Sequence, residues 1–200
     1  MVTVVDYKAG NLTSVVKALR FLKAEVRVAT HAHTLKTATC IVLPGVGHFA
    51  ATARLDQSGM TQAIRNAIAR GVPFLGICVG MQWLFAGSTE APDQPGLGYF
   101  SQQVTRFPGH QEKVPHVGWN QLEFAAESPL LQGVSSGEYA YFTHAWRAPV
   151  THQTIATTHY IEPFAAACQH QRVCGVQFHP EKSSVVGLKI LSNFLEIATC

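Results

Sequence analysis

Residues 71–82 read GVPFLGICVGMQ, and this stretch is the strongest indication of fold class in the sequence. The apolar run PFLGI (73–77) is followed at once by a cysteine, and the sequence beyond it favours a helix that begins near Gly80. A short apolar run bounded by turn residues is typical of a buried strand. A strand that passes directly into a helix is the unit of an α/β sheet, and ligands bind outside the carboxyl ends of such strands.

Cys78 occupies the turn between the expected strand and the expected helix. A turn that lifts a side chain out of this junction brings two backbone segments close together, and glycine at Gly76 and Gly80 removes the Cβ atoms that would collide. The pattern GxCxG follows the logic of the GxSxG turn of serine hydrolases, which presents a nucleophile. Cys78 is therefore a candidate nucleophile, and a buried core cysteine is the alternative.

The first half of the chain alternates between two hydrophobic periods. Short apolar runs predict strands at 2–5, 25–29, 40–43 and 73–77. Between these runs, apolar residues recur at helical spacing over 12–22 and 60–68. This alternation predicts an α/β fold with a mostly parallel central sheet flanked by helices.

The second half has a different character. Strand-like pieces broken by turn residues lie at 97–107, 119–124, 139–146, 154–160 and 172–178. A helix with an apolar face is expected only at 185–197, and surface loops are expected at 94–98 and 107–113. We expect a small antiparallel annex in this half, followed by a return of the chain to the main sheet.

The segment FHPEKS, residues 178–183, carries a candidate base. Pro180 favours extended geometry at His179, so His179 and Glu181 can project to the same side. A thiol nucleophile needs a base to take its proton, and the base needs a carboxylate to hold its tautomer and stabilise the imidazolium. His179 and Glu181 fit these two roles, and a surface turn with a solvated glutamate is the alternative.

The segment PGVGHF, residues 44–49, follows another expected strand. Attack on an amide carbonyl creates an oxyanion, and loop N–H groups with little side-chain cover can donate hydrogen bonds to it. Gly45, Val46 and Gly47 supply such a loop, and the N–H of Val79 is the expected second donor. The two glycines also allow a peptide beside Val46 to rotate at little steric cost. An ordinary glycine turn is the alternative.

Composition limits the class of protein. The chain has 200 residues, 47% of them hydrophobic, which suits one domain over 1–200. Charged residues make up 14% and the formal net charge is +3, so no basic stripe for nucleic acid or a membrane surface is expected. The first residues lack a signal-peptide pattern, and the five cysteines are widely spaced, which favours the cytoplasm. Cys168 and Cys174 can face each other across a hairpin, but we expect no disulfide there.

The ten histidines raise the question of a metal site. The closest pair, His31 and His33, follows an expected strand without further ligands at suitable spacing, so we expect solvated turn residues. His144 follows a strand-like piece and has no neighbouring carboxylate, so we expect it to be structural or adjacent to the substrate. We expect neither a metal nor another cofactor.

The segments PGVG, GICVGMQ and GVQFHPEKS, in this order, resemble the class I, or triad-type, glutamine amidotransferases over nearly the whole chain. The further motifs VDYKAGNLTSV, KVPHVGWNQL and YAYFTHAW are similar to the glutaminase subunits of imidazole glycerol phosphate synthase, an enzyme of histidine biosynthesis. The resemblance implies that Cys78 attacks the side-chain amide of glutamine, His179 protonates the departing ammonia and Glu181 orients His179. Water then releases glutamate.

The resemblance also implies binding residues and a partner. The side chain of Gln82 and the backbone of Ala145 and Trp146 would hold glutamine, while residues 45–47 would form the oxyanion strand. The partner would be a cyclase subunit with a (β/α)8 barrel fold that receives the ammonia. The positions that match its docking face are Asn11, Trp119, Tyr141 and Lys182.

The chain departs from the family pattern at a few positions. Val79 stands where leucine is usual, and Ala145 and Trp146 replace a small hydroxyl residue followed by tyrosine. These positions contribute mostly backbone, so we expect the chemistry to be kept. Lys8 replaces a glycine in the loop DYKAGN, which puts the shape of that loop near the partner in question.

Three other functions compete with this one. A glutaminase of the same class can serve another acceptor, in anthranilate or pyridoxal phosphate synthesis, although GNLTSV and PHVGWN argue against it. A cysteine hydrolase of the α/β-hydrolase type usually carries an aspartate between the nucleophile and a lone late histidine, which differs from HPE. A binding module without catalysis has little reason to keep Cys78, His179 and Glu181 together.

Overall fold

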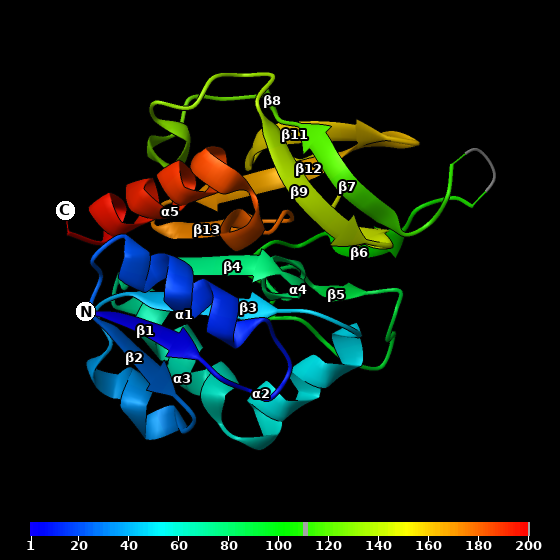
Figure 1. Cartoon of the computed structure of the whole chain (residues 1–200). Coiled ribbons are helices and arrows are strands. Elements are labelled where there is room, and N and C mark those ends of the chain that lie inside the picture. The colour runs from blue at the N-terminus through cyan, green and yellow to red at the C-terminus, as the bar shows by residue number, and fades with distance from the viewer. Residues whose placement is uncertain (110–111, 200) are drawn as a thin grey trace.

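A computed structural model describes residues 1–109 and 112–199 of the chain (Figure 1). Its largest feature is an eight-stranded sheet in the order β2-β1-β3-β4-β13-β12-β11-β8. In that order the strands are β2 (Val26–Ala29), β1 (Val2–Val5), β3 (Ile41–Gly45), β4 (Phe74–Cys78), β13 (Val173–Val176), β12 (Glu162–His170), β11 (Thr154–Tyr160) and β8 (Glu123–Phe124).

The sheet changes direction at β13. From β2 to β13 every neighbouring pair is parallel, whereas β12, β11 and β8 join antiparallel. The predicted mostly parallel sheet is confirmed, and so is the return of the chain to it, because β13 lies beside β4. Most of the antiparallel part expected as an annex instead extends the main sheet.

The predicted helices are confirmed, and they bury the apolar faces that predicted them. The helices are α1 (Leu12–Phe21), α2 (Ala53–Gln57), α3 (Met60–Ala69), α4 (Val79–Gln82) and α5 (Ser184–Thr199), with short 3₁₀ turns η1 (Ala32–Thr37), η2 (Phe49–Thr52), η3 (Pro129–Leu131) and η4 (Pro180–Lys182). Figure 1 shows α1 and α5 on the near face of the sheet. Right-handed crossovers put α3 on the other face. Within the described residues, no helix combines the length and apolar character needed to cross a bilayer.

Two small sheets stand beside the main one. Strands β7 (His116–Gln121) and β9 (Tyr139–His144) form an antiparallel pair, which is the separate part of the expected annex. The other sheet joins β10 (Trp146–Arg147), β6 (Gln103–Arg106) and β5 (Gly87–Ser88). The loop predicted at 94–98 is confirmed, and part of the loop predicted at 107–113, residues 110–111, lies outside the described residues.

Cys168 and Cys174 lie on β12 and β13, which form an antiparallel hairpin. In its register Cys168 pairs with Gly175 and Cys174 pairs with Gln169, so the two cysteines are offset by one position. Side chains alternate between the faces of a sheet, so this offset points the two thiols to opposite faces. Both thiols are free and buried.

Candidate active site

Cys78 is the last residue of β4 and adopts a backbone conformation that residues with a side chain rarely take, with φ 54° and ψ −110°. Gly76 and Gly80, on either side of Cys78, must be glycines because backbone atoms approach them closely. A Cβ at Gly76 would lie 2.4 Å from the carbonyl oxygen of Gly80, and a Cβ at Gly80 would lie 2.0 Å from the carbonyl oxygen of Leu43. The strained elbow expected from GxCxG is therefore present, and a single turn of helix, α4, follows it.

The other described cysteines lack such a setting. Burial raises the pKa of Cys40, Cys168 and Cys174 to about 12, so these thiols stay protonated. They lie in the core, whereas Cys78 lines a cavity. Among the described cysteines, Cys78 is the one placed to react.

His179 and Glu181 form a buried pair behind the elbow. Nδ1 of His179 lies 2.9 Å from Oε1 of Glu181, and their side chains are 1% and 0% exposed. Burial acts to lower the pKa of His179, but its interactions with Cys78 and Glu181 outweigh burial and raise that pKa to about 9. Within the described residues, Nε2 of His179 makes no hydrogen bond. The imidazole is thus anchored on one nitrogen and free on the other.

The loop that carries this pair is fixed by strand β9. The N–H of His179 donates to the carbonyl oxygen of Tyr141 at 2.9 Å, and the hydroxyl of Ser183 donates to the carbonyl oxygen of His179 at 2.7 Å. The hydroxyl of Ser183 in turn accepts from the N–H of Tyr141 at 2.9 Å. These bonds hold the turn HPEKS against the sheet, which sets where the imidazole points.

Asn11 has a contact that its place in the sequence does not reveal. Its side-chain amide donates to Oε1 of Glu181 at 3.0 Å, so the carboxylate receives hydrogen bonds from both His179 and Asn11. We expected Asn11 at the docking face of a partner. The contact joins residues 170 positions apart, and no local pattern of the sequence predicts it.

A cavity of about 240 Å³ opens in front of Cys78. Seven of the expected site residues line it: Val46, Gly47, Cys78, Val79, Gln82, Ala145 and Trp146. Gly45 lies beside them, because it pairs with Cys78 in the register of β3 and β4. The remaining lining residues are Glu90, Thr143 and His144. The structure thus brings residues from four separate segments to one small cavity.

Two glutamine side chains link Cys78 to the backbone of Trp146. The amide nitrogen of Gln82 donates to the carbonyl oxygen of Trp146 at 2.9 Å and to Oε1 of Gln177 at 3.1 Å. The amide of Gln177 donates to Sγ of Cys78 at 3.6 Å. Gln177 precedes the segment FHPEKS, and its contact with the thiol was missed because strand alternation alone does not say which residue faces the elbow.

Glu90 was not predicted as a site residue from the sequence. Its Oε2 accepts from the N–H of Phe49 at 2.8 Å, which fixes the carboxylate at the cavity, and Oε1 accepts no hydrogen bond from the residues that the structure describes. The segment GSTEAP around Glu90 has no strand or helix pattern. A carboxylate in a small cavity suits a cationic group on a ligand.

A family model described as "Glutamine amidotransferase class-I" matches residues 3–198. The chain belongs to this family. A relative from Deinococcus radiodurans, named imidazole glycerol phosphate synthase subunit HisH, is 44% identical over 197 residues, covering 96% of this chain and 92% of the relative. A relative of the same name from Caldanaerobacter subterraneus subsp. tengcongensis is 40% identical over 203 residues, covering 100% of both chains.

Solved structures share the fold of this chain. One described as "Crystal structure of glutamine amidotransferase" superposes with a TM-score of 0.79 at 20% identity and covers 100% of both chains. Another, "Structure of PurLQS from Thermotoga maritima", has a TM-score of 0.76 at 18% identity and covers 98% of this chain and 97% of the other. At these identities the likeness establishes the fold alone.

Three of the four residues expected to face a partner lie together on the surface of this amidotransferase. Trp119 on β7 is 52% exposed and its ring meets that of Tyr141 on β9 edge to face, with centroids 6.0 Å apart. The ammonium group of Lys182 lies 5.8 Å from the centre of the Tyr141 ring. Asn11 instead lies half buried against Glu181.

Lys8, the departure from the family pattern in the loop DYKAGN, keeps a backbone that suits glycine. Its φ is 62°, in the left-handed region, and its N–H donates to Oδ1 of Asp6 at 2.9 Å. Its ammonium group lies 3.0 Å from Oδ2 of the same aspartate. The contacts with Asp6 help a lysine to occupy a conformation that glycine takes freely.

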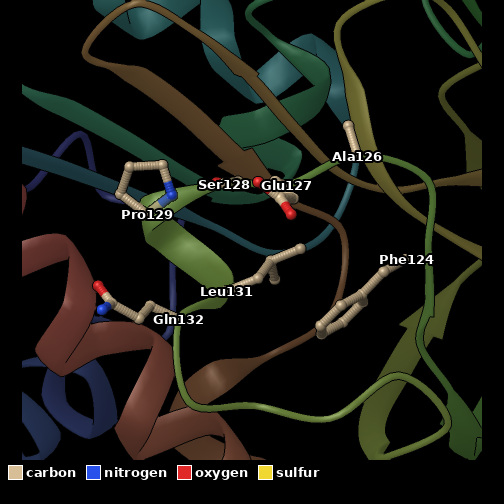
Figure 2. A pocket seen from close by; sticks show the side chains of 7 residues that line it. All are labelled: Phe124, Ala126, Glu127, Ser128, Pro129, Leu131 and Gln132. Atoms are coloured by element: carbon tan, nitrogen blue, oxygen red, sulfur yellow. The ribbon is translucent and has the colours of Figure 1, made fainter.

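Two other places were considered as sites, the pair His31 and His33 and a second cavity. His31 and His33 are exposed around the start of η1, and the described residues contain no cluster of three or more metal-ligating side chains. Figure 2 shows a larger cavity, of about 590 Å³, which contains no predicted site residue. It is lined by Phe124, Ala126, Glu127, Ser128, Pro129, Leu131 and Gln132.

Proposed function

We propose that this chain hydrolyses glutamine to glutamate and ammonia through Cys78, His179 and Glu181, and passes the ammonia to a cyclase subunit that makes imidazole glycerol phosphate. The observation that carries the proposal is the strained Cys78 elbow at the mouth of a small cavity, backed by the buried pair of His179 and Glu181. A nucleophile, a base and an orienting carboxylate in this order are the parts of a triad.

The reaction proceeds in two steps. Because the pKa of His179 is raised to about 9, Nε2 of its imidazole holds the proton given up by the thiol of Cys78, and Sγ attacks the amide carbon of glutamine as a thiolate. His179 returns this proton to the amide nitrogen as the C–N bond breaks, so ammonia leaves and a glutamyl thioester forms. Water, deprotonated by the same imidazole, then attacks the thioester, and release of glutamate restores the thiol.

Residues of the cavity would bind the α-ammonium group of glutamine and the oxyanion of the transition state. The carboxylate of Glu90 would accept hydrogen bonds from the α-ammonium group of glutamine, because its Oε1 accepts none from the described part of the chain. The N–H of Val79 and a backbone N–H of residues 45–47 would donate to the oxyanion. Gln82 and the backbone of Ala145 and Trp146 would hold the remaining part of glutamine.

The partner would be a cyclase subunit of (β/α)8 barrel fold, as the family resemblance implies, and the relatives are named as subunits of imidazole glycerol phosphate synthase. The exposed group of Trp119, Tyr141 and Lys182 supports a docking face on β7 and β9. We place the chain in the cytoplasm, where a reducing environment keeps a cysteine nucleophile active, and the four described cysteines are free.

The test compares three conditions. Glutamate release is measured for the chain alone, with a cyclase subunit, and with the cyclase and its phosphoribosyl substrate. The two glycines beside Val46 allow the oxyanion donor to be misaligned until docking, so we expect stimulation of roughly 10² to 10³ fold on going from the first condition to the third. Equal rates would refute the coupling, and stimulation by an anthranilate or pyridoxal phosphate partner instead would assign the chain to another acceptor.

A further inference from the structure

A chain of hydrogen bonds runs from strand β7 to the wall of the catalytic cavity. Nδ2 of Asn120 lies 3.3 Å from Nε2 of His116, and Nδ1 of His116 lies 3.2 Å from Nε2 of His144. Nδ1 of His144 then lies 2.9 Å from the carbonyl oxygen of Trp146. The two histidines face each other in the β7–β9 register and are 3% and 7% exposed. The triad uses neither of them.

One assignment of protons satisfies every contact in this chain. The carbonyl oxygen of Trp146 can only accept, so His144 carries its proton on Nδ1. Burial lowers the pKa of His144 to about 3, so the ring is neutral and its bare Nε2 accepts from Nδ1–H of His116. Burial lowers the pKa of His116 to about 4, so Nε2 of this neutral ring accepts from the amide of Asn120.

Asn120 fixes the direction of the chain at its far end. Its amide nitrogen also donates to the carbonyl oxygen of His159 at 3.0 Å, and its Oδ1 accepts from the N–H of Gln121 at 2.8 Å. The amide therefore cannot turn over without losing both contacts. The amide N–H of Asn120 is therefore held toward Nε2 of His116. His116 then donates through Nδ1–H to His144, and His144 donates through Nδ1–H to the carbonyl oxygen of Trp146.

Aromatic packing holds the rings in place. His116 stacks on Tyr160 with centroids 4.1 Å apart and on Phe142 with centroids 5.1 Å apart. His144 packs against the ring of Phe164 with centroids 5.0 Å apart. Neither imidazole can rotate out of line without displacing these neighbours.

The chain ends on the backbone that lines the substrate cavity. The carbonyl oxygen of Trp146 accepts from His144 and also from Gln82, and all three residues line the cavity with Cys78. Loss of the His144 contact would leave the carbonyl oxygen of Trp146 with Gln82 as its side-chain donor, so the carbonyl could tilt within the limits set by the pairing of β10 with β6. We propose that His144 and His116 are positioning residues that hold the Trp146 peptide in the orientation that binds glutamine, an inference that rests on the proposed function.

The kinetic test separates positioning from folding, and it is made on the chain with its cyclase partner. His116→Phe keeps a ring for the aromatic stack but removes the donor to His144, so KM for glutamine should rise about 5- to 20-fold while kcat changes less than about threefold. His116→Asn should restore KM, because its amide nitrogen can stand where Nδ1 stood. Phe164→Leu disturbs the same cluster without removing a hydrogen bond, and its KM should stay within about twofold of wild type.

A second measurement does not depend on activity. Long-range ¹H–¹⁵N correlation spectra of the imidazoles should show both His116 and His144 as Nδ1–H tautomers, with signals assigned by their loss in His116→Asn and His144→Asn. An Nε2–H tautomer at His144 in the wild-type protein would overturn the inference, as would an unchanged KM in His116→Phe. A wild-type protein that releases no glutamate with its partner present would refute the proposed function instead, while the spectra still decide the tautomers.

Discussion

At the scale of single residues, we propose that the charge of Glu181 supports His179 as the base. Its carboxylate is fully buried and accepts hydrogen bonds from His179 and Asn11. Glu181→Gln keeps the size of the side chain but removes the charge that supports the imidazolium, so kcat should fall by roughly 10² to 10⁴ fold. The measurement is glutamate release at saturating glutamine. A loss of about twofold or less would return Glu181 to a structural role.

Asn11 and Lys182 were both expected at the docking face, but their contacts differ, so variants of the two residues can be compared. Asn11 donates to Glu181, whereas Lys182 lies exposed over the ring of Tyr141. Asn11→Ala removes one hydrogen bond to a buried carboxylate, so the rate of the isolated chain should fall about 10-fold. Lys182→Ala should leave that rate unchanged and weaken only the stimulation by cyclase. Equal basal rates in the two variants would mean that Asn11 does not support the triad.

At the scale of elements, the junction of β4 and α4 depends on glycine. A Cβ at Gly80 would lie 2.0 Å from the carbonyl oxygen of Leu43, and this backbone atom cannot move without displacing β3. Gly80→Ala should therefore lower the free energy of unfolding by roughly 2 to 4 kcal/mol and abolish activity. Gly109→Ala is the control, because a Cβ there meets no atom of the described residues within 4 Å. Denaturant unfolding checks both variants, and similar stability in the two would contradict the close approach.

The pairing of β7 and β9 buries two neutral histidines, which makes stability depend on pH. The pKa of His116 is lowered by burial to about 4 in the folded protein, so below pH 6.5 the unfolded chain binds a proton that the folded chain does not. Stability from this burial is present above pH 6.5 and is lost as the pH falls toward 4. In His116→Phe, the slope of the free energy of unfolding between these pH values should be shallower by up to about 1.4 kcal/mol per pH unit.

The control for this prediction is Phe164→Leu, which should be less stable than wild type but keep the wild-type slope. The carboxylates contribute equally to all three proteins, so the difference in slope isolates the histidine. Identical slopes in wild type and His116→Phe would contradict a neutral, buried His116.

Elements with a strong local pattern were predictable from the sequence. Strand β1 was expected at 2–5 and found at Val2–Val5, and α3 was expected at 60–68 and found at Met60–Ala69. Strand β12 was missed because its buried run FAAAC is rich in alanine, which has low β propensity. It forms because it pairs on both sides, with β11 and β13, and such long-range pairing leaves no local mark.

The site residues divide in the same way, into those with a local sequence pattern and those brought in by long-range contacts. The elbow, the HPE turn and the glycine loop have local reasons, so Cys78, His179 and Gly47 could be named from the sequence. The contacts of Asn11 with Glu181 and of Glu90 with Phe49 join segments far apart in the chain. They follow from the order of the strands, which a hydrophobic pattern does not determine.

At the scale of the whole molecule, the main sheet takes strands from both halves of the chain, and we propose that residues 1–200 form one domain. Strand β4 carries Cys78, and its neighbours β3 and β13 end at the oxyanion loop and just before His179. Because parallel strands share a carboxyl edge, three adjacent strands bring the proposed nucleophile, the proposed oxyanion donors and the proposed base to one place.

We propose that Cys78 is the nucleophile that hydrolyses glutamine, and glutamate release in the presence of the cyclase and its substrate measures this activity. Cys78→Ala should reduce release to the background rate, while Cys40→Ala, a change at a cysteine buried in the core, should keep the wild-type rate. Denaturant unfolding of both variants confirms that each is folded. Glutamate release by Cys78→Ala at a rate close to that of wild type would contradict the account.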